Sequence, residues 1–113
     1  NQIIAMNQNS INRVELQGRV GTVRVQSVGG RLVSNFSLQT EHHYELKDGS
    51  GVVCECTWHN CVAYEGGEID TNGMTRGSLV HVCGRLRNNR YTAADGSERT
   101  FTEVIASSLH VKE

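Results

Sequence analysis

Apolar and polar residues alternate along most of this chain, which is the pattern of strands that bury one face. The first such segment covers residues 13–20, where valine and leucine alternate with charged and amide side chains. The same reasoning predicts further strands over residues 32–40, 52–64, 80–87 and 98–111. The chain is therefore expected to be all-β.

Glycine-containing polar segments separate the predicted strands at residues 28–31, 47–51 and 94–97. Glycine adopts positive φ without strain, so these segments predict hairpin turns. Residues 65–78 interrupt the alternation, and their glycines permit at most one short helix around 65–75. Five strands with one longer connection predict a five-stranded OB-fold Greek-key barrel, since closure protects the sheet edges.

The length and charge of the chain limit what it can be. With 113 residues it is expected to form a single domain over residues 12–113, preceded by a flexible N-terminal leader over residues 1–11. No apolar run approaches the length of a membrane span, and no signal-peptide pattern is present, so a cytoplasmic protein is expected. The formal net charge is −1, but arginines gather in residues 1–40 and 76–100, with acidic residues between them. This segregation fits either a basic binding surface or a solvated face.

The four cysteines raise the question of a metal site. Cys54, Cys56, His59, Cys61 and Cys83 are the residues that a zinc ion would use. Alternation along a strand, however, sends Cys54 and Cys56 to one face and His59 and Cys61 to the other. Reduced thiols are therefore expected, with no metal and no cofactor. No nucleophile elbow, phosphate-binding glycine loop or His-Glu-x-x-His motif is found, so an enzyme is not expected.

The aromatic residues with a polar group indicate a binding surface. Flat side chains in extended, arginine-rich sequence suit the stacking of unpaired bases. One tryptophan and three tyrosines have this character: Tyr44, Trp58, Tyr64 and Tyr91. Trp58 could instead belong to the core, but alternation places it on the same face as Asn60, which favours an exposed position. Phe36 and Phe101 are assigned to the core, and His59 is interpreted as a structural histidine.

Five segments, in order, resemble the bacterial single-stranded DNA-binding protein family. The most specific is TWHNCVAY at residues 57–64, which is similar to the family's Glu-Trp-His-Arg-Val-Val-Leu-Phe. The others are NRVELQGRVG at 12–21, NFSLQT at 35–40, GSLVHVCGRLR at 77–87, and DGSER with TEV within 95–104. The resemblance covers residues 12 to 111 and implies an OB-fold with extended hairpin arms.

This resemblance implies sequence-independent binding and protection of single-stranded DNA in replication, recombination and repair. The family's stacking positions correspond to Tyr44, Trp58, Tyr64 and Tyr91. The phosphate contacts implied by family position or by an outward place on a strand or hairpin are Arg13, Arg31, Lys47, Arg76, Arg85, Arg87 and Arg90. A homotetramer formed partly through the first strands is implied, with a dimer as the alternative, in the cytoplasm with the nucleoid.

The chain departs from the family pattern in three places. Up to residue 113 the sequence has no glycine- and proline-rich linker and no acidic tip of the kind that recruits replication and repair proteins in the family, so such partners are not expected to be recruited through these residues. A glycine-broken segment over residues 65–76 stands in place of a helix, and Asn60 stands where the family commonly has arginine. The second departure leaves primosomal replication protein N, an OB-fold adaptor that acts through protein contacts, as the alternative.

Overall fold

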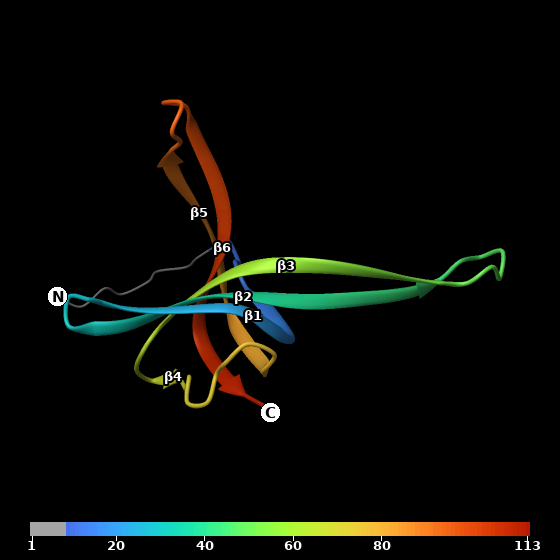
Figure 1. Ribbon diagram of the computed structural model, residues 1–113, viewed down its shortest axis with the longest axis horizontal. Helices are drawn as coiled ribbons and strands as arrows, with labels where there is room; N and C mark the ends of the chain where they lie inside the picture. The colour runs from blue at the N-terminus through green and yellow to red at the C-terminus, as the bar shows by residue number, and fades with distance from the viewer. Residues whose placement is uncertain (1–8) are drawn as a thin grey trace.

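The computed structural model describes residues 9–113, and their regular structure consists of strands (Figure 1). The strands are β1 (Val14–Val28), β2 (Arg31–Glu45), β3 (Val52–Tyr64), β4 (Glu68–Ile69), β5 (Leu79–Thr92) and β6 (Glu98–Val111). The all-β prediction is confirmed, and the predicted bounds of β3 and β6 match the observed ones. The strands β1, β2 and β5 run longer than expected because they continue into hairpins beyond the barrel.

The barrel closes because two strands each pair with different neighbours along their length. The first half of β1 pairs with β5, from Val14 opposite Gly84, while its second half pairs with β2. A register shift between Val20 and Val23 marks the change, as expected where an irregularity bends a strand. A short parallel pairing of β3 with β6 completes the ring. This is the predicted five-stranded barrel, with the two-residue β4 added beside β6.

A glycine permits a close backbone contact at the irregularity in the pairing of β5 with β6. The register of this pair shifts between Cys83 and Gly84. A Cβ atom at Gly84 would collide with the backbone carbonyl of Ile105, so a larger residue would force the two strands apart. Glycine at this position therefore permits the close backbone contact on which barrel closure depends.

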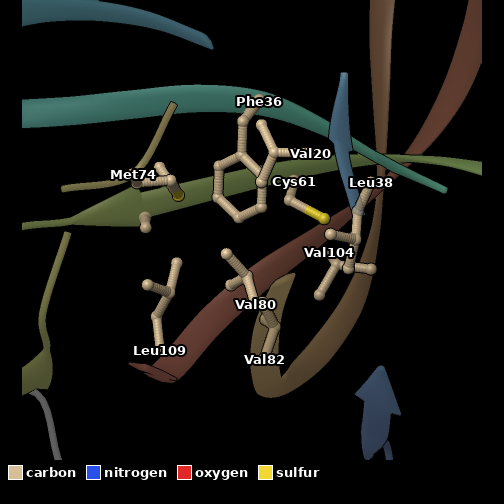
Figure 2. Close-up of a cluster of buried hydrophobic side chains, with 10 residues drawn as sticks. Val20, Phe36, Leu38, Cys61, Met74, Val80, Val82, Val104 and Leu109 are labelled. Atoms are coloured by element: carbon tan, nitrogen blue, oxygen red, sulfur yellow. The ribbon is translucent and has the colours of Figure 1, made fainter. Parts of the chain in front are cut away.

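The core fills the barrel with side chains from all five long strands (Figure 2). Its largest fully buried residues are Leu38 and Leu109, which are joined by Val80 and Val82 of β5. Phe36 is buried as predicted. The core members labelled in Figure 2 are Val20, Phe36, Leu38, Cys61, Met74, Val80, Val82, Val104 and Leu109.

The connection between β3 and β5 contains turns and β4, and the structure shows no helix there. Met74 from this connection is buried and packs into the core cluster, so the segment covers part of the barrel. None of the residues that the structure describes forms a helix able to span a membrane. The expected leader over residues 1–11 lies largely outside the described residues. Next to it, the Asn12 amide pairs with the backbone of Leu86 through two hydrogen bonds of 2.7 and 2.9 Å.

Hairpins project from the barrel in different directions (Figure 1). The end of β2 and the start of β3 form one of them, the β2–β3 arm, which we define as residues 41–56. The β5–β6 arm, defined as residues 85–101, points away from it, and the β1–β2 hairpin extends opposite the β2–β3 arm. These projections give the molecule an elongated extent of 58 × 38 × 37 Å.

Candidate nucleic-acid interface

Trp58 presents an exposed, flat ring on the outer surface of β3. It lies opposite Gln39 of β2, and 58% of its surface is accessible. Its indole packs over Gly21, where an added Cβ would lie 2.6 Å from ring atom Cζ3. The glycine thus leaves room for the ring to lie flat against β1, with one face turned outward.

Polar side chains hold the surface beneath and beside this ring. The hydroxyl of Ser37 accepts a hydrogen bond of 2.9 Å from the backbone N–H of Thr22, and the two hydroxyls lie 3.1 Å apart. A hollow of about 350 Å³ lies here, and it is lined by Gly21, Thr22, Ser37, Trp58 and Arg76. Arg76 therefore places a cation next to the exposed indole, which is the arrangement required for a base with its phosphate.

A larger groove of about 510 Å³ begins at the same two hydroxyl residues. It crosses β1, β2, β3 and β6, and Thr22 and Ser37 line both hollows, so the two are continuous. Arg24 lies opposite Asn35 in the register of β1 and β2 and contributes a cation to the groove. The groove residues are Thr22, Val23, Arg24, Asn35, Phe36, Ser37, Asn60, Cys61, Val62, Phe101 and Glu103.

The far end of the groove carries an aromatic pair on the β5–β6 arm. Tyr91 and Phe101 are 48% and 37% exposed, and their ring centroids lie 5.8 Å apart in an edge-to-face arrangement. The assignment of Phe101 to the core is therefore wrong. Phe101 lies directly opposite Asn89 and is two residues from Arg99 and from Glu103, so its side chain points to the same side of the β5–β6 pair as these polar residues. The polar residues two positions away on either side were the sequence signal that would have identified Phe101. Arg24 was missed although it alternates with Val23 and Val25, which is a comparable signal.

A buried carboxylate fixes the root of the β5–β6 arm. Glu103 is only 6% exposed, and it accepts hydrogen bonds of 2.6 and 3.2 Å from the guanidinium of Arg87, across the strand pair. Asn89 donates a further hydrogen bond to the same oxygen. The bond from Glu103 raises the pKa of Arg87. The charge of Arg87 is thus already paired with a carboxylate, which reduces its attraction for a phosphate.

Tyr64 and Arg31 form one unit at the opposite edge of the surface. The guanidinium carbon of Arg31 lies 5.5 Å from the centre of the Tyr64 ring, a cation–π distance. Its Nε also donates a 3.1 Å hydrogen bond to the carbonyl of Glu65. The half-buried ring of Tyr64 therefore has a cation over one face, and a base must share or displace it.

Tyr44 lies on the β2–β3 arm, away from the other three. It is opposite Val53, and alternation along β2 places it on the face opposite Gln39 and Trp58. Its closest ring neighbour is His42, with 5.9 Å between the centroids. A nucleic-acid strand bound over Trp58 would have to pass around the β2–β3 arm to reach Tyr44.

The remaining predicted phosphate contacts are exposed but dispersed. Arg13 precedes β1, and Lys47 lies in the turn of the β2–β3 arm next to Asp48. On β5, Arg85 shares a face with Arg87, whereas Arg90 faces the other side, opposite Thr100. The predicted basic residues therefore form no single stripe across the groove.

The zinc ligands considered from the sequence are not brought together. Cys61 is buried in the core, where desolvation raises the pKa of its thiol to about 12. Cys54 and Cys56 are exposed on the β2–β3 arm, and Cys83 lies on β5. His59 is half-buried, and its Nε2 lies 2.8 Å from the Thr40 hydroxyl. The interpretation of His59 as a structural histidine is confirmed.

The closed five-stranded barrel, in which β1 pairs with both β2 and β5, belongs to the class of OB-fold domains. Residues 11–112 match the model of the Single-strand binding protein family. The chain therefore belongs to the single-strand binding protein family. This match favours the main family over primosomal replication protein N.

Individual relatives agree with this placement. A single-stranded DNA-binding protein of Neisseria meningitidis serogroup A is 34% identical over 104 residues, which cover 88% of this chain and 59% of that protein. Another from Xanthomonas axonopodis pv. citri is 32% identical over 106 residues, covering 89% and 57%. The solved structure titled "Plasmodium falciparum SSB complex with ssDNA" matches with a TM-score of 0.78 at 26% identity, covering 96% of this chain and 100% of that one. The chain thus spans less than two thirds of the length of the curated relatives it matches.

Proposed function

We propose that this chain binds and protects single-stranded DNA without sequence preference, in replication, recombination and repair. One observation carries the proposal: the exposed Trp58 ring, the groove and the Tyr91–Phe101 pair form a continuous surface across the barrel. Thr22 and Ser37 line both hollows and join them. A flat path with an aromatic platform at each end suits an unpaired strand, whose bases are free to stack.

Stacking supplies most of the affinity in this proposal because the chain has a net charge of only −1. Each stacked base contributes about 1–3 kcal/mol, and every base offers a π-face, so little sequence preference is expected. Trp58 and the Tyr91–Phe101 pair stack bases along the groove. Two further tyrosines extend the path of the bound DNA. They are Tyr64, which lies beneath Arg31, and Tyr44, which lies on the far face of the β2–β3 arm.

Phosphates are neutralised by cations beside the stacked bases. Arg24 within the groove and Arg76 next to Trp58 have the most direct positions. Arg87 acts mainly through Glu103, by holding the arm in place. The other contributors are exposed residues around this path: Arg13, Arg31, Lys47, Arg85 and Arg90.

The assembly is proposed to be a homotetramer, in which first strands of two copies pair. Residues 14–18 of β1 pair with β5 on one edge, and among the described residues their other edge has no strand partner. A free edge of this kind is a template for pairing with a second chain. Native mass spectrometry would show four chains per particle, whereas a dimer or a monomer would overturn this part of the proposal.

The proposed activity is binding without catalysis, in the cytoplasm where chromosomal strands are exposed. The test compares wild-type protein with Trp58→Ala and Trp58→Phe by fluorescence polarisation of a labelled oligo-dT. We expect the alanine variant to bind about 5- to 150-fold more weakly, from the loss of one stacked base, and the phenylalanine variant to retain most of the affinity. Equal binding of duplex and single-stranded DNA, or an unchanged affinity in Trp58→Ala, would overturn the proposal.

A further inference from the structure

The β2–β3 arm carries four metal-binding side chains on one face. Glu41 and His43 lie on β2, directly opposite Cys56 and Cys54 on β3. Because the residues in each strand are two positions apart, all four point to the same side of the hairpin. Two adjacent cross-strand pairs thus form a square of one carboxylate, one imidazole and two thiols.

The distances within this square suit a small dication. Ligand atoms of Glu41, His43 and Cys54 all lie within 4.8 Å of one another. The His43 Nε2 is 3.7 Å from the Glu41 Oε2, and the Cys54 and Cys56 sulfurs are 4.0 Å apart. Zinc bonds of about 2.3 Å to sulfur and about 2.0–2.1 Å to nitrogen and oxygen, at tetrahedral angles, require ligand separations of about 3.8 and 3.4 Å. Rotation of these exposed side chains would bring the atoms to such separations, with Cys56, which lies outside the 4.8 Å cluster, turning toward the other three.

The thiol pair is better placed for a metal than for a disulfide. Two residues on one strand, two positions apart, have Cα atoms separated by about 6.6–6.8 Å, at the upper limit of disulfide geometry. Their side chains project in parallel, which suits two sulfurs that share one ion.

We propose that the β2–β3 arm binds one Zn²⁺ through Cys54, Cys56, His43 and Glu41. Four protein ligands complete a tetrahedral shell, so this site is structural, with no position left for a substrate. Glu41 and His43 lie on β2 and were not among the ligands considered from the sequence, because only the cross-strand register places them opposite the two thiols.

Zinc binding would stiffen the β2–β3 arm without changing its net charge. Zinc coordinates cysteine as the thiolate, so each of the two thiols gives up its proton when the ion binds. Zinc binding releases these two protons, which balance the two charges of the ion. The ion therefore acts as a cross-strand clamp, two residues from Trp58 on the same face.

A second cluster supplies a matched control. Glu15, His81 and Cys83 bring three ligand atoms within 4.8 Å of one another, on β1 and β5. This cluster has one thiol and lies on the barrel, remote from the arm in the strand pairing. A Cys83→Ser variant removes its thiol and leaves the proposed site intact.

The experiment titrates reduced protein with Co²⁺, whose tetrahedral thiolate complexes have intense visible and near-ultraviolet bands, and then adds Zn²⁺ as competitor. We expect one Co²⁺ per chain, bands of a two-thiolate tetrahedral site, and their loss when one equivalent of Zn²⁺ is added. Cys83→Ser should keep these bands, and the double variant Cys54→Ser/Cys56→Ser should lose them while retaining the far-ultraviolet circular dichroism of the barrel.

Three outcomes would overturn the proposal: no tetrahedral bands in wild-type protein, bands that survive in the double variant, or bands that disappear in Cys83→Ser. None of these bears on binding of single-stranded DNA, which is measured separately with oligo-dT.

Discussion

The two hairpin arms have the same topology and opposite chemistry. The β5–β6 arm holds four arginines against two carboxylates, whereas the β2–β3 arm holds four carboxylates against one lysine, together with two histidines and two cysteines. Glu103 anchors the first arm to Arg87 and Asn89. The β2–β3 arm continues the pairing of β2 and β3 far beyond the barrel. In the proposed function, the β5–β6 arm is the one that attracts and stacks nucleic acid, and the β2–β3 arm serves mainly a different chemistry.

The largest contrast is expected in DNA affinity. Replacing both rings of the β5–β6 arm, by Tyr91→Ala with Phe101→Ala, should cost about 1–3 kcal/mol, since the base they hold loses its platform. That corresponds to roughly 5- to 150-fold weaker binding of oligo-dT in fluorescence polarisation. Tyr44→Ala on the other arm should cost less, because Tyr44 lies on the far face. An equal loss in both variants would show that the strand follows both arms alike.

The buried carboxylate of the β5–β6 arm should matter for folding stability. Glu103→Gln leaves Arg87 without its charge partner and should lower the free energy of unfolding by about 1–3 kcal/mol. The midpoint of thermal unfolding, followed by circular dichroism, should fall by several degrees. Glu98→Gln, at an exposed position of the same arm, should leave the midpoint unchanged. A Glu103→Gln variant as stable as wild type would contradict the anchoring role.

The salt dependence of DNA affinity should differ between a variant in the groove and a variant at the tip of the β2–β3 arm. Arg24→Gln should make the slope of log affinity against log salt shallower by about 0.7, the value for one phosphate on a single strand. Lys47→Gln should change the slope less, because Lys47 lies among carboxylates at the arm tip. Polarisation titrations of oligo-dT at several salt concentrations give both slopes. A larger change of slope in Lys47→Gln than in Arg24→Gln would place the path of the bound DNA on the β2–β3 arm instead.

The smallest effect concerns His59, at the root of the β2–β3 arm. Partial burial lowers its pKa, so the folded chain binds a proton less readily than the unfolded chain does. Stability contributed by neutral His59 is therefore complete above the unfolded pKa of about 6.5 and is lost as the pH falls below it. The drop in unfolding midpoint between about pH 7.5 and about pH 5.5 should be smaller in His59→Gln than in wild type. His110→Gln, at an exposed position, should keep the full drop; an unchanged drop in His59→Gln would contradict this account.

Local sequence patterns were sufficient for the strands and turns. Alternation and glycine turns located β3 and β6 to the residue, because both signals depend on neighbours in sequence. Closure of the barrel depends on the parallel pairing of Asn60 with Glu103, which are far apart in the chain. The number of strands predicted a closed barrel and the family resemblance implied the same fold, but neither identified the residues that pair to close it.

The candidate site was only partly predictable, because its chemistry arises from pairs across strands. Trp58 was placed correctly on an exposed face, since its own strand shows the alternation. Phe101 was misassigned although polar residues two positions away on either side indicated its outward position, and its contact with Tyr91 depends on the register of β5 and β6. The pairing of Arg87 with Glu103, and the facing of Glu41 and His43 with two cysteines, likewise depend on register.

The central claim is that an unpaired base stacks on the exposed face of Trp58. Trp58 is the only tryptophan in the chain, so its fluorescence reports this site alone. The most direct measurement is a titration of that fluorescence with oligo-dT at several salt concentrations. The account predicts strong, saturable quenching with an affinity that falls as salt rises. An unquenched tryptophan at saturating oligo-dT would contradict it.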